Sequence, residues 1–227
     1  MASSPCGTID FKDPTTFTWH KDNVSSATAT ASVGGQTQTV SFASTISGYD
    51  YSGPTSTFDG TNFDSLYSYG GVLLHQTRDG SGSGCRGGVA GGDSGYGQTV
   101  TITFSPAPVK DVELTISGFT WPGNGDPNYR DAVYIASPAF QVVRRGSYIV
   151  QDSAGTVEDP FQPTRATADN AGADTYNAVT VRFSGNVSTI RLHYWDNRPG
   201  DSCDGKSGAN IQGVYISGLK FSTEACR

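Results

Sequence analysis

Alternation of apolar and polar residues over short stretches constrains the fold of this chain more than any other feature. In TVTITF (99–104), three apolar side chains point one way and three threonines the other. VELTI (112–116), AVTVRF (178–183) and STIRLHYW (188–195) repeat the pattern. This period predicts antiparallel strands with one face on the core and one in water. The residues expected to face inward are Val100, Ile102, Phe104, Val112, Leu114, Ile116, Val179, Val181, Phe183, Ile190, Leu192 and Tyr194.

Helical periodicity with caps is missing from every stretch of comparable length, so we expect an all-β chain. The 29 glycines and 11 prolines agree with many short strands joined by turns. The segments 100–116 and 179–195 echo each other as strand, turn after Phe-Ser, and strand, which we interpret as similar hairpins in the two sheets of a β-sandwich. ISGFTW (116–121) and ISGLKF (216–221) each carry a Ser-Gly that predicts a bulge. DFKDPTTFTWH, ATATASV, QTQTVSFAS and SLYSYGGVLLH predict further strands in the first third. No linker divides two cores, so residues 1–227 are expected to form one domain, with 1–6 as a tail.

The four cysteines predict disulfides and an oxidising compartment. None forms a CxxC pair and no histidine stands at zinc-ligand spacing from them. Three pairings are formally open. We favour Cys6–Cys226, which would join the termini, and Cys85–Cys203, which would join two glycine-rich loops. A bridge that closes so long a loop would stabilise the fold by about 4–5 kcal/mol on the chain-entropy model.

Charge and hydropathy exclude two classes of partner. The net charge of −6 argues against nucleic acid, which needs a basic face. No run of about 18 apolar residues predicts a membrane span. The start MASSPCGTIDF lacks the apolar stretch of a signal peptide, so we expect Met1 to begin a trimmed piece of an exported protein, with any wall or membrane anchor outside it.

Five segments in order carry a family resemblance: TVTITFSPAPVKDVELTISGF, YRDAVYIASPAF, VEDPFQP, AVTVRFSGNVSTIRLHYWDN and IQGVYISGLKFS. Residues 97–223 resemble extracellular β-sandwich domains of secreted or wall-anchored surface proteins of actinobacteria. The resemblance implies a jelly-roll-like, surface-displayed module of adhesin type within a larger surface protein, and implies no catalytic residues. Such domains often have an acidic D-x-D stretch after the LTI strand, whereas this chain has SGFTWPGNGD.

Two acidic loops have the oxygen-rich spacing that a calcium ion needs. The first offers Asn124, Asp126, Asn128 and Asp131, and the second offers Asp196, Asn197, Asp201 and Asp204. Both lack the terminal Glu of an EF-hand, and the same residues are also ordinary turn formers. Calcium is therefore the one cofactor that the sequence suggests, as a structural ion rather than a catalytic one.

Aromatic residues near these loops suggest a binding surface. Parity on 189–195 places Arg191, His193 and Trp195 opposite the inward side chains, where a bare tryptophan would stack on a sugar. The alternative is that a second layer covers this face and makes Trp195 part of a core. Trp121 and Tyr129 flank the first acidic loop and Asn197 lies in the second.

The motifs that suggest catalysis are less specific than those that suggest binding. GDSG around Ser94 matches the nucleophile stretch of trypsin-like proteases, but it stands too early in the chain and lacks the rest of that pattern. Glu113 is the one acidic residue inside a strong strand, although nothing pairs it with a second carboxylate for glycoside hydrolysis. A Lys–Asn isopeptide from Lys12 or Lys110 has no identified triad.

The expected function is that of a secreted or cell-surface, lectin-like binding module without catalytic activity. Its ligand would be carbohydrate or another cell-surface molecule, bound through loops 121–131 and 195–206. The alternatives are a structural stalk domain without a small ligand, and a glycoside hydrolase on the same scaffold.

Overall fold

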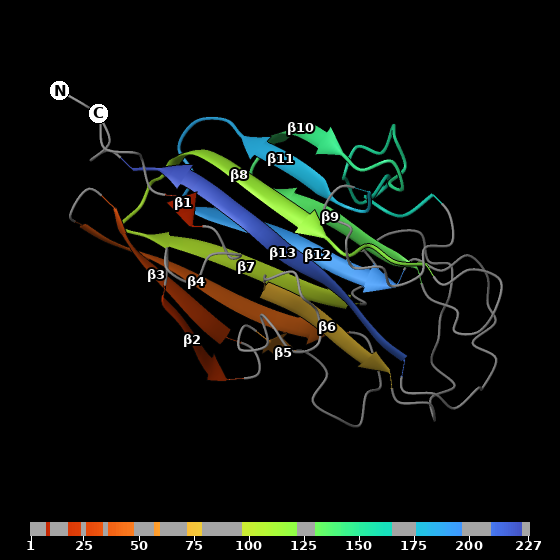
Figure 1. Cartoon of the computed structure of the whole chain (residues 1–227), viewed down its shortest axis with the longest axis horizontal. Helices are drawn as coiled ribbons and strands as arrows, with labels where there is room; N and C mark the ends of the chain where they lie inside the picture. The colour runs from red at the N-terminus through yellow and green to blue at the C-terminus, as the bar shows by residue number, and fades with distance from the viewer. Residues whose placement is uncertain are drawn as a thin grey trace.

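A computed structural model describes residues 8–9, 18–23, 26–33, 36–47, 57–59, 72–78, 97–121, 130–164, 176–196 and 210–223. All thirteen elements in these ranges are β-strands, and they form two antiparallel sheets (Figure 1). No helix long and apolar enough to cross a membrane occurs in the described ranges.

Seven strands form sheet A, in which β13 (Asn210–Ser222) is central. The order along the sheet is β10 (Phe140–Arg145), β11 (Val179–Phe183), β8 (Lys110–Ser117), β13, β6 (Val72–Arg78) and β5 (Thr57–Asp59). The short strand β1 (Thr8–Ile9) also pairs with β13, at Leu219 and Lys220. The first and last described strands of the chain are therefore hydrogen-bonded neighbours.

Six strands form sheet B, in which β7 is flanked by one strand from each half of the chain. The order is β2 (Thr18–Asn23), β3 (Ser26–Val33), β4 (Gln36–Ser47), β7 (Gly97–Ser105), β12 (Thr189–Asp196) and β9 (Asp131–Ser137). The first third of the sequence, to which no resemblance applied, thus supplies strands to both sheets.

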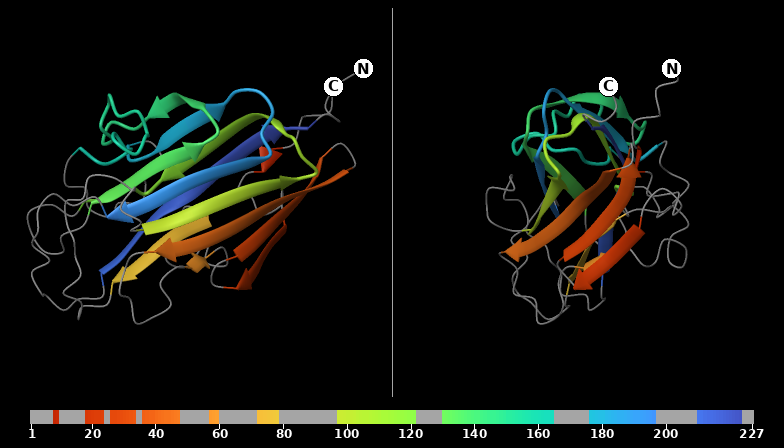
Figure 2. Two further views of the ribbon diagram at one scale, coloured as in Figure 1. Left: turned by 180° about the vertical axis from the view of Figure 1, so that it is seen from behind. Right: turned by 90° about the vertical axis from the view of Figure 1, so that its left-hand side faces the viewer.

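The two sheets lie as layers around one shared apolar cluster, a sandwich-like arrangement that Figure 2 shows from two sides. All twelve side chains that the alternation predicts to face inward are 2% exposed or less. Sheet B contributes Val40, Phe42, Val100, Ile102 and Leu192, and sheet A contributes Leu74, Leu114, Ile116, Val181 and Val214. The prediction of an all-β chain with two antiparallel sheets is confirmed.

The interpretation of the two echoing segments as hairpins is wrong. In the first segment, β7 lies in sheet B and β8 in sheet A. In the second segment, β11 lies in sheet A and β12 in sheet B. Each segment therefore crosses from one sheet to the other, and its two strands pack their apolar side chains against the core from opposite sides. The two connections pair with each other, because Val109 N donates to Val187 O (2.9 Å) and Val187 N to Val109 O (2.8 Å).

Of the two Ser-Gly bulges that the sequence predicts, one is present. The register of β13 against β8 shifts between Ile216 and Gly218, as a bulge at Ser217 requires. Ser117 instead ends β8, and Gly118 follows with φ 81°, in the left-handed region that favours glycine.

The loop between β10 and β11 is ordered over residues 146–164 by its own contacts. Phe161 is fully buried and exchanges backbone hydrogen bonds with Val133. The Asp159 carboxylate accepts from Ala154 N (2.6 Å), and the Asp159 carbonyl accepts from Gly155 N (2.8 Å). This loop therefore packs against β9 and connects the edge of sheet A to the edge of sheet B.

Candidate functional site

Three aromatic side chains gather on the outer face of sheet B, where β9 and β12 pair. The ring of Tyr134 lies 5.3 Å from His193 and 5.7 Å from Trp195, and the latter two rings are 5.7 Å apart. His193 Nδ1 is 2.9 Å from Thr99 Oγ1 on the neighbouring strand β7. The expected outward direction of Arg191, His193 and Trp195 agrees with this arrangement.

Trp195 is not bare. It is 4% exposed, as is His193, whereas Arg191 of the same strand is exposed. The expectation of a bare indole ring for sugar stacking is therefore corrected in favour of the alternative that this end of the face is covered. Aromatic packing against Tyr134 holds the ring in place.

Asp131, an expected calcium ligand, is the first residue of β9 and is completely buried. Its Oδ2 accepts from Thr120 N (2.7 Å) and Thr120 Oγ1 (2.8 Å), and its Oδ1 accepts from Tyr194 OH (2.8 Å). Three donors thus satisfy the carboxylate in place of water. Asp131 thus links the segment after β8 to β9 and β12. The prediction of Asp131 as a calcium ligand in the first acidic loop did not include this role. The signal for it was Tyr194, because an inward tyrosine needs a partner for its hydroxyl.

Trp121 and Arg130 bracket the first acidic loop and contact each other. The guanidinium carbon lies 4.9 Å from the centroid of the Trp121 ring, a cation–π distance. Arg130 also donates to Pro163 O from Nη2 (2.7 Å) and Nε (3.2 Å). Burial lowers the pKa of Arg130 from its ordinary value, but a guanidinium remains charged at neutral pH. Trp121 is half-buried.

A second aromatic pair, Tyr148 and Tyr176, was not expected from the sequence. The rings are stacked with centroids 5.3 Å apart and planes 24° apart, and Tyr176 is 51% exposed. Tyr148 N donates to Tyr176 O (2.7 Å), which ties the loop 146–164 to the start of β11. No periodic pattern marks either residue, since both lie between strands.

These two aromatic pairs belong to the same end of the sandwich. Phe119 N donates to Asn177 O (3.4 Å) and Asn177 Nδ2 donates to Phe119 O (3.3 Å). Trp121 and Tyr176 each lie within two residues of this contact. Thr164, which follows the Pro163 that binds Arg130, donates its N–H to Tyr148 O (2.7 Å). We call Trp121, Arg130, Tyr148 and Tyr176 the aromatic end.

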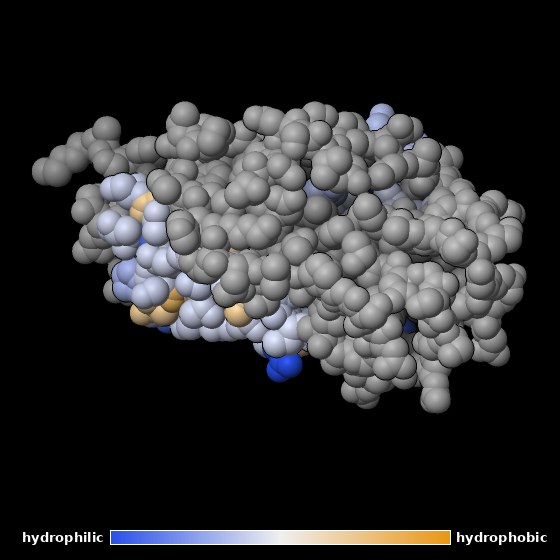
Figure 3. All heavy atoms as spheres, turned by 90° about the horizontal axis from the view of Figure 1, so that it is seen from below, coloured by the Kyte–Doolittle hydropathy of each residue, from blue (hydrophilic) through white to orange (hydrophobic). Residues whose placement is uncertain are grey.

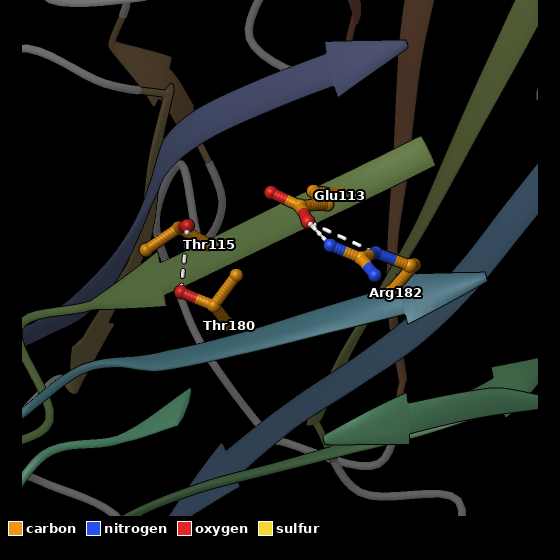
Figure 4. A network of polar contacts seen from close by, with 4 residues as sticks. All are labelled: Glu113, Thr115, Thr180 and Arg182. Atoms are coloured by element: carbon orange, nitrogen blue, oxygen red, sulfur yellow. Dashed lines mark hydrogen bonds and ion pairs between the residues drawn. The ribbon is translucent and has the colours of Figure 1, made fainter. Parts of the chain in front are cut away.

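Glu113, the candidate acid of a hydrolase, lies on the outer face of sheet A in an ion pair with Arg182 (Figure 4). Arg182 Nε donates to Glu113 Oε1 at 3.0 Å, and Nη2 donates to the same oxygen. Lys220 stands opposite Glu113 on the other side, on β13. Asp111, two residues earlier on β8, accepts from Ser222 Oγ (2.5 Å). Both carboxylates have structural partners, as in ordinary cross-strand pairs.

Several predicted residues lie outside the described ranges. They are the ligand residues Tyr129 and Asn197, the calcium ligands Asn124, Asp126, Asn128, Asp201 and Asp204, and the four cysteines Cys6, Cys85, Cys203 and Cys226. The backbone of Asp196 is described, and it pairs with Asp131 at the end of β12. Within the described part of the chain, no three His, Cys, Asp or Glu side chains form a group that could hold a metal.

Comparison with known proteins does not place the chain: no family model, no curated protein and no solved structure matches it.

Proposed function

We propose that the chain is a secreted or surface-displayed binding module without catalytic activity, and that it recognises carbohydrate or another cell-surface ligand. The observation that carries the proposal is the aromatic end. A tyrosine that is 51% exposed and already stacked on a second ring offers a preformed flat surface. Because Tyr148 holds Tyr176 in place, little side-chain entropy is lost when a ligand packs on it.

A fixed charge at the same end of the sandwich suits a polar ligand. Arg130 presents its guanidinium beside the half-buried Trp121 ring, with Pro163 O fixing its position. Binding sites for small polar ligands combine apolar and aromatic surface with a few fixed polar groups. The loops 121–131 and 195–206 would complete the site, with calcium as a structural ion in one of them.

The finer description of the fold is part of the proposal. We propose a jelly-roll-like sandwich with the bridges Cys6–Cys226 and Cys85–Cys203, in a module of the adhesin type found on actinobacterial surfaces. The pairing of β1 with β13 supports the first bridge, because it brings Thr8 opposite Lys220. Mass mapping under reducing and non-reducing conditions tests the bridges, and a Cys6–Cys85 pair would contradict them.

A glycan array, read with and without EDTA, tests the function. Wild-type protein is compared with Tyr176→Ala, which removes the exposed ring. The matched control is Val143→Ala, since Val143 is 50% exposed, lies on β10 and does not belong to the aromatic end. We expect Tyr176→Ala to lose most of the signal and the control to keep it. EDTA should lower the signal and the melting temperature if calcium orders the loops.

Other outcomes favour the competing functions. A blank array together with a melting temperature that EDTA does not change would support a structural stalk domain. Turnover of a polysaccharide that Glu113→Gln abolishes would support a glycoside hydrolase.

A further inference from the structure

The outer face of sheet B has an unusual composition over three adjacent strands. Burial alternates without a break between Ser26 and Ser32 on β3, between Thr37 and Thr45 on β4, and between Thr99 and Ser105 on β7. Every residue that alternation turns outward in these three ranges is serine, threonine or alanine. We call this surface the hydroxyl face. None of its side chains carries a charge, although the adjacent strand β12 has the exposed Arg191 opposite Thr101.

The composition of the chain does not explain this neutrality. Charged residues make up 16% of the sequence, and the outer face of sheet A carries Glu113, Arg182 and Lys220 within three adjacent strands. On the side of the molecule that Figure 3 shows, the coloured surface is mostly pale, with a few strongly hydrophilic and a few hydrophobic residues. An uncharged face is complementary to an uncharged ligand, because a charged ligand would lose its hydration without an ionic partner.

The register arranges the hydroxyl groups in rows across the strands. One row runs Thr28, Ser41, Thr103 and Thr189 through β3, β4, β7 and β12. Neighbouring strands lie about 4.8 Å apart, and alternate residues along a strand about 6.6 Å apart. Hydroxyl groups, each both donor and acceptor, therefore recur along and across the strands, except that the row through Ser26 and Thr101 is interrupted by Ala43 and ends at Arg191.

One row ends in aromatic rings. It runs from Thr45 through Thr99 to His193 and then to Tyr134 on β9. Tyr134 is half-buried, and its ring packs against His193 and Trp195. The hydroxyl rows therefore end at this packed aromatic cluster.

We propose that the hydroxyl face binds an uncharged, extended polysaccharide chain that crosses β3, β4 and β7. This inference rests on the proposed function, namely that the module binds carbohydrate, and names the class of glycan. A polysaccharide chain presents hydroxyl groups at the spacing of its sugar rings, which is close to the spacing between strands. Because each strand of a sheet is rotated by about 20–25° from its neighbour, the hydroxyl groups do not lie in one plane. A flexible polysaccharide chain can follow that rotation, whereas a rigid, flat ligand cannot.

Affinity electrophoresis tests the inference, with gels that contain a galactomannan (neutral), polygalacturonate (acidic) or no polysaccharide. The test variant is Thr103→Glu, in the middle of the first row and exposed. The matched control is Thr180→Glu on the outer face of sheet A, where Arg144 is its cross-strand neighbour. Thr103→Ser keeps the hydroxyl group, Ser41→Glu is a second test on the adjacent strand, and Tyr176→Ala tests the aromatic end.

We expect galactomannan to retard the wild-type protein and polygalacturonate not to. Thr103→Glu and Ser41→Glu should weaken retardation about tenfold, equivalent to about 1.4 kcal/mol. Thr103→Ser and Thr180→Glu should behave like wild type. Circular dichroism and melting curves confirm that each variant is folded.

Four results would overturn the inference. Equal retardation of Thr103→Glu, Ser41→Glu and Thr180→Glu would show that the hydroxyl face is not the site. If Tyr176→Ala alone loses retardation, the proposed function stands and this inference fails. Retardation by polygalacturonate alone would contradict an uncharged ligand, and no retardation in any gel, with a blank glycan array, would remove the proposed function as well.

Discussion

Asp131 and Tyr194 illustrate at the scale of single residues how a buried carboxylate can be accommodated in the core. The carboxylate is fully buried and receives three hydrogen bonds from Thr120 and Tyr194. A buried charge without such partners would be very costly. The stability of the end of the sandwich therefore depends on donors that the apolar pattern alone does not reveal.

Tyr194→Phe removes one of those donors and keeps the ring. We expect the free energy of unfolding to fall by about 1.5–3 kcal/mol, the range for a hydrogen bond to a charged group. Urea denaturation measures the change. Tyr176→Phe is the control: its hydroxyl belongs to an exposed side chain, so the change should stay within about 0.5 kcal/mol. Equal effects of the two substitutions would contradict the assigned role of Tyr194.

Two glycines with positive φ differ in their surroundings, which allows a matched comparison. A Cβ on Gly155 (φ 72°) would lie 2.3 Å from the buried ring of Phe161, whereas a Cβ on Gly185 (φ 78°) would meet nothing within 4 Å. Gly185→Ala should cost about 1–2 kcal/mol for the left-handed backbone alone. Gly155→Ala should cost about 1–3 kcal/mol more, because the ring must also move. Thermal melts of both variants measure the difference, and equal losses would contradict the tight contact.

Strand β12 shows at the scale of elements what the sequence could predict and what it could not. The inward set Ile190, Leu192 and Tyr194 is correct because a period of two follows directly from backbone geometry. The exposure of Trp195 could not be predicted, since it depends on Tyr134, which reaches it only through the pairing of β12 with β9.

The pairing of the strands was harder to predict than the strands themselves. The echo between 100–116 and 179–195 correctly identified four strands, but their apolar faces fit a hairpin and a crossover equally well. The pairing of Val109 with Val187 between the two connections is a contact of distant residues, which no local pattern encodes. The same holds for the stacking of Tyr148 on Tyr176.

The cross-strand ion pair of β8 and β11 should contribute little to stability. Arg182 is 56% exposed and Glu113 24% exposed, so solvent screens their attraction. Glu113→Gln should lower the free energy of unfolding by less than about 1 kcal/mol, and by less still at high salt. Urea denaturation at two salt concentrations measures this. A loss of several kcal/mol that does not depend on salt would assign Glu113 a larger role.

At the scale of the whole molecule, the two sheets share one apolar cluster and should unfold together. Phe42 of sheet B and Leu114 of sheet A are both 1% exposed or less in that cluster. Phe42→Ala and Leu114→Ala should each lower the free energy of unfolding by about 2–5 kcal/mol while the melt remains a single transition. Calorimetry measures the number of transitions. Two separate transitions, each sensitive to one substitution, would show that the layers are independent.

The position of β13 also determines when sheet A can form. Among the described strands, β13 alone joins β6 and β5 to β8, β11 and β10, and it comes after all of them in the chain. Until β13 has been synthesised, β6 with β5 and β8 with β11 and β10 therefore cannot be joined into one sheet, and the edges of β6 and β8 that pair with β13 lack this partner. Contacts between distant residues also slow folding. Sheet A is thus completed only once β13, the last of its strands in chain order, has been synthesised.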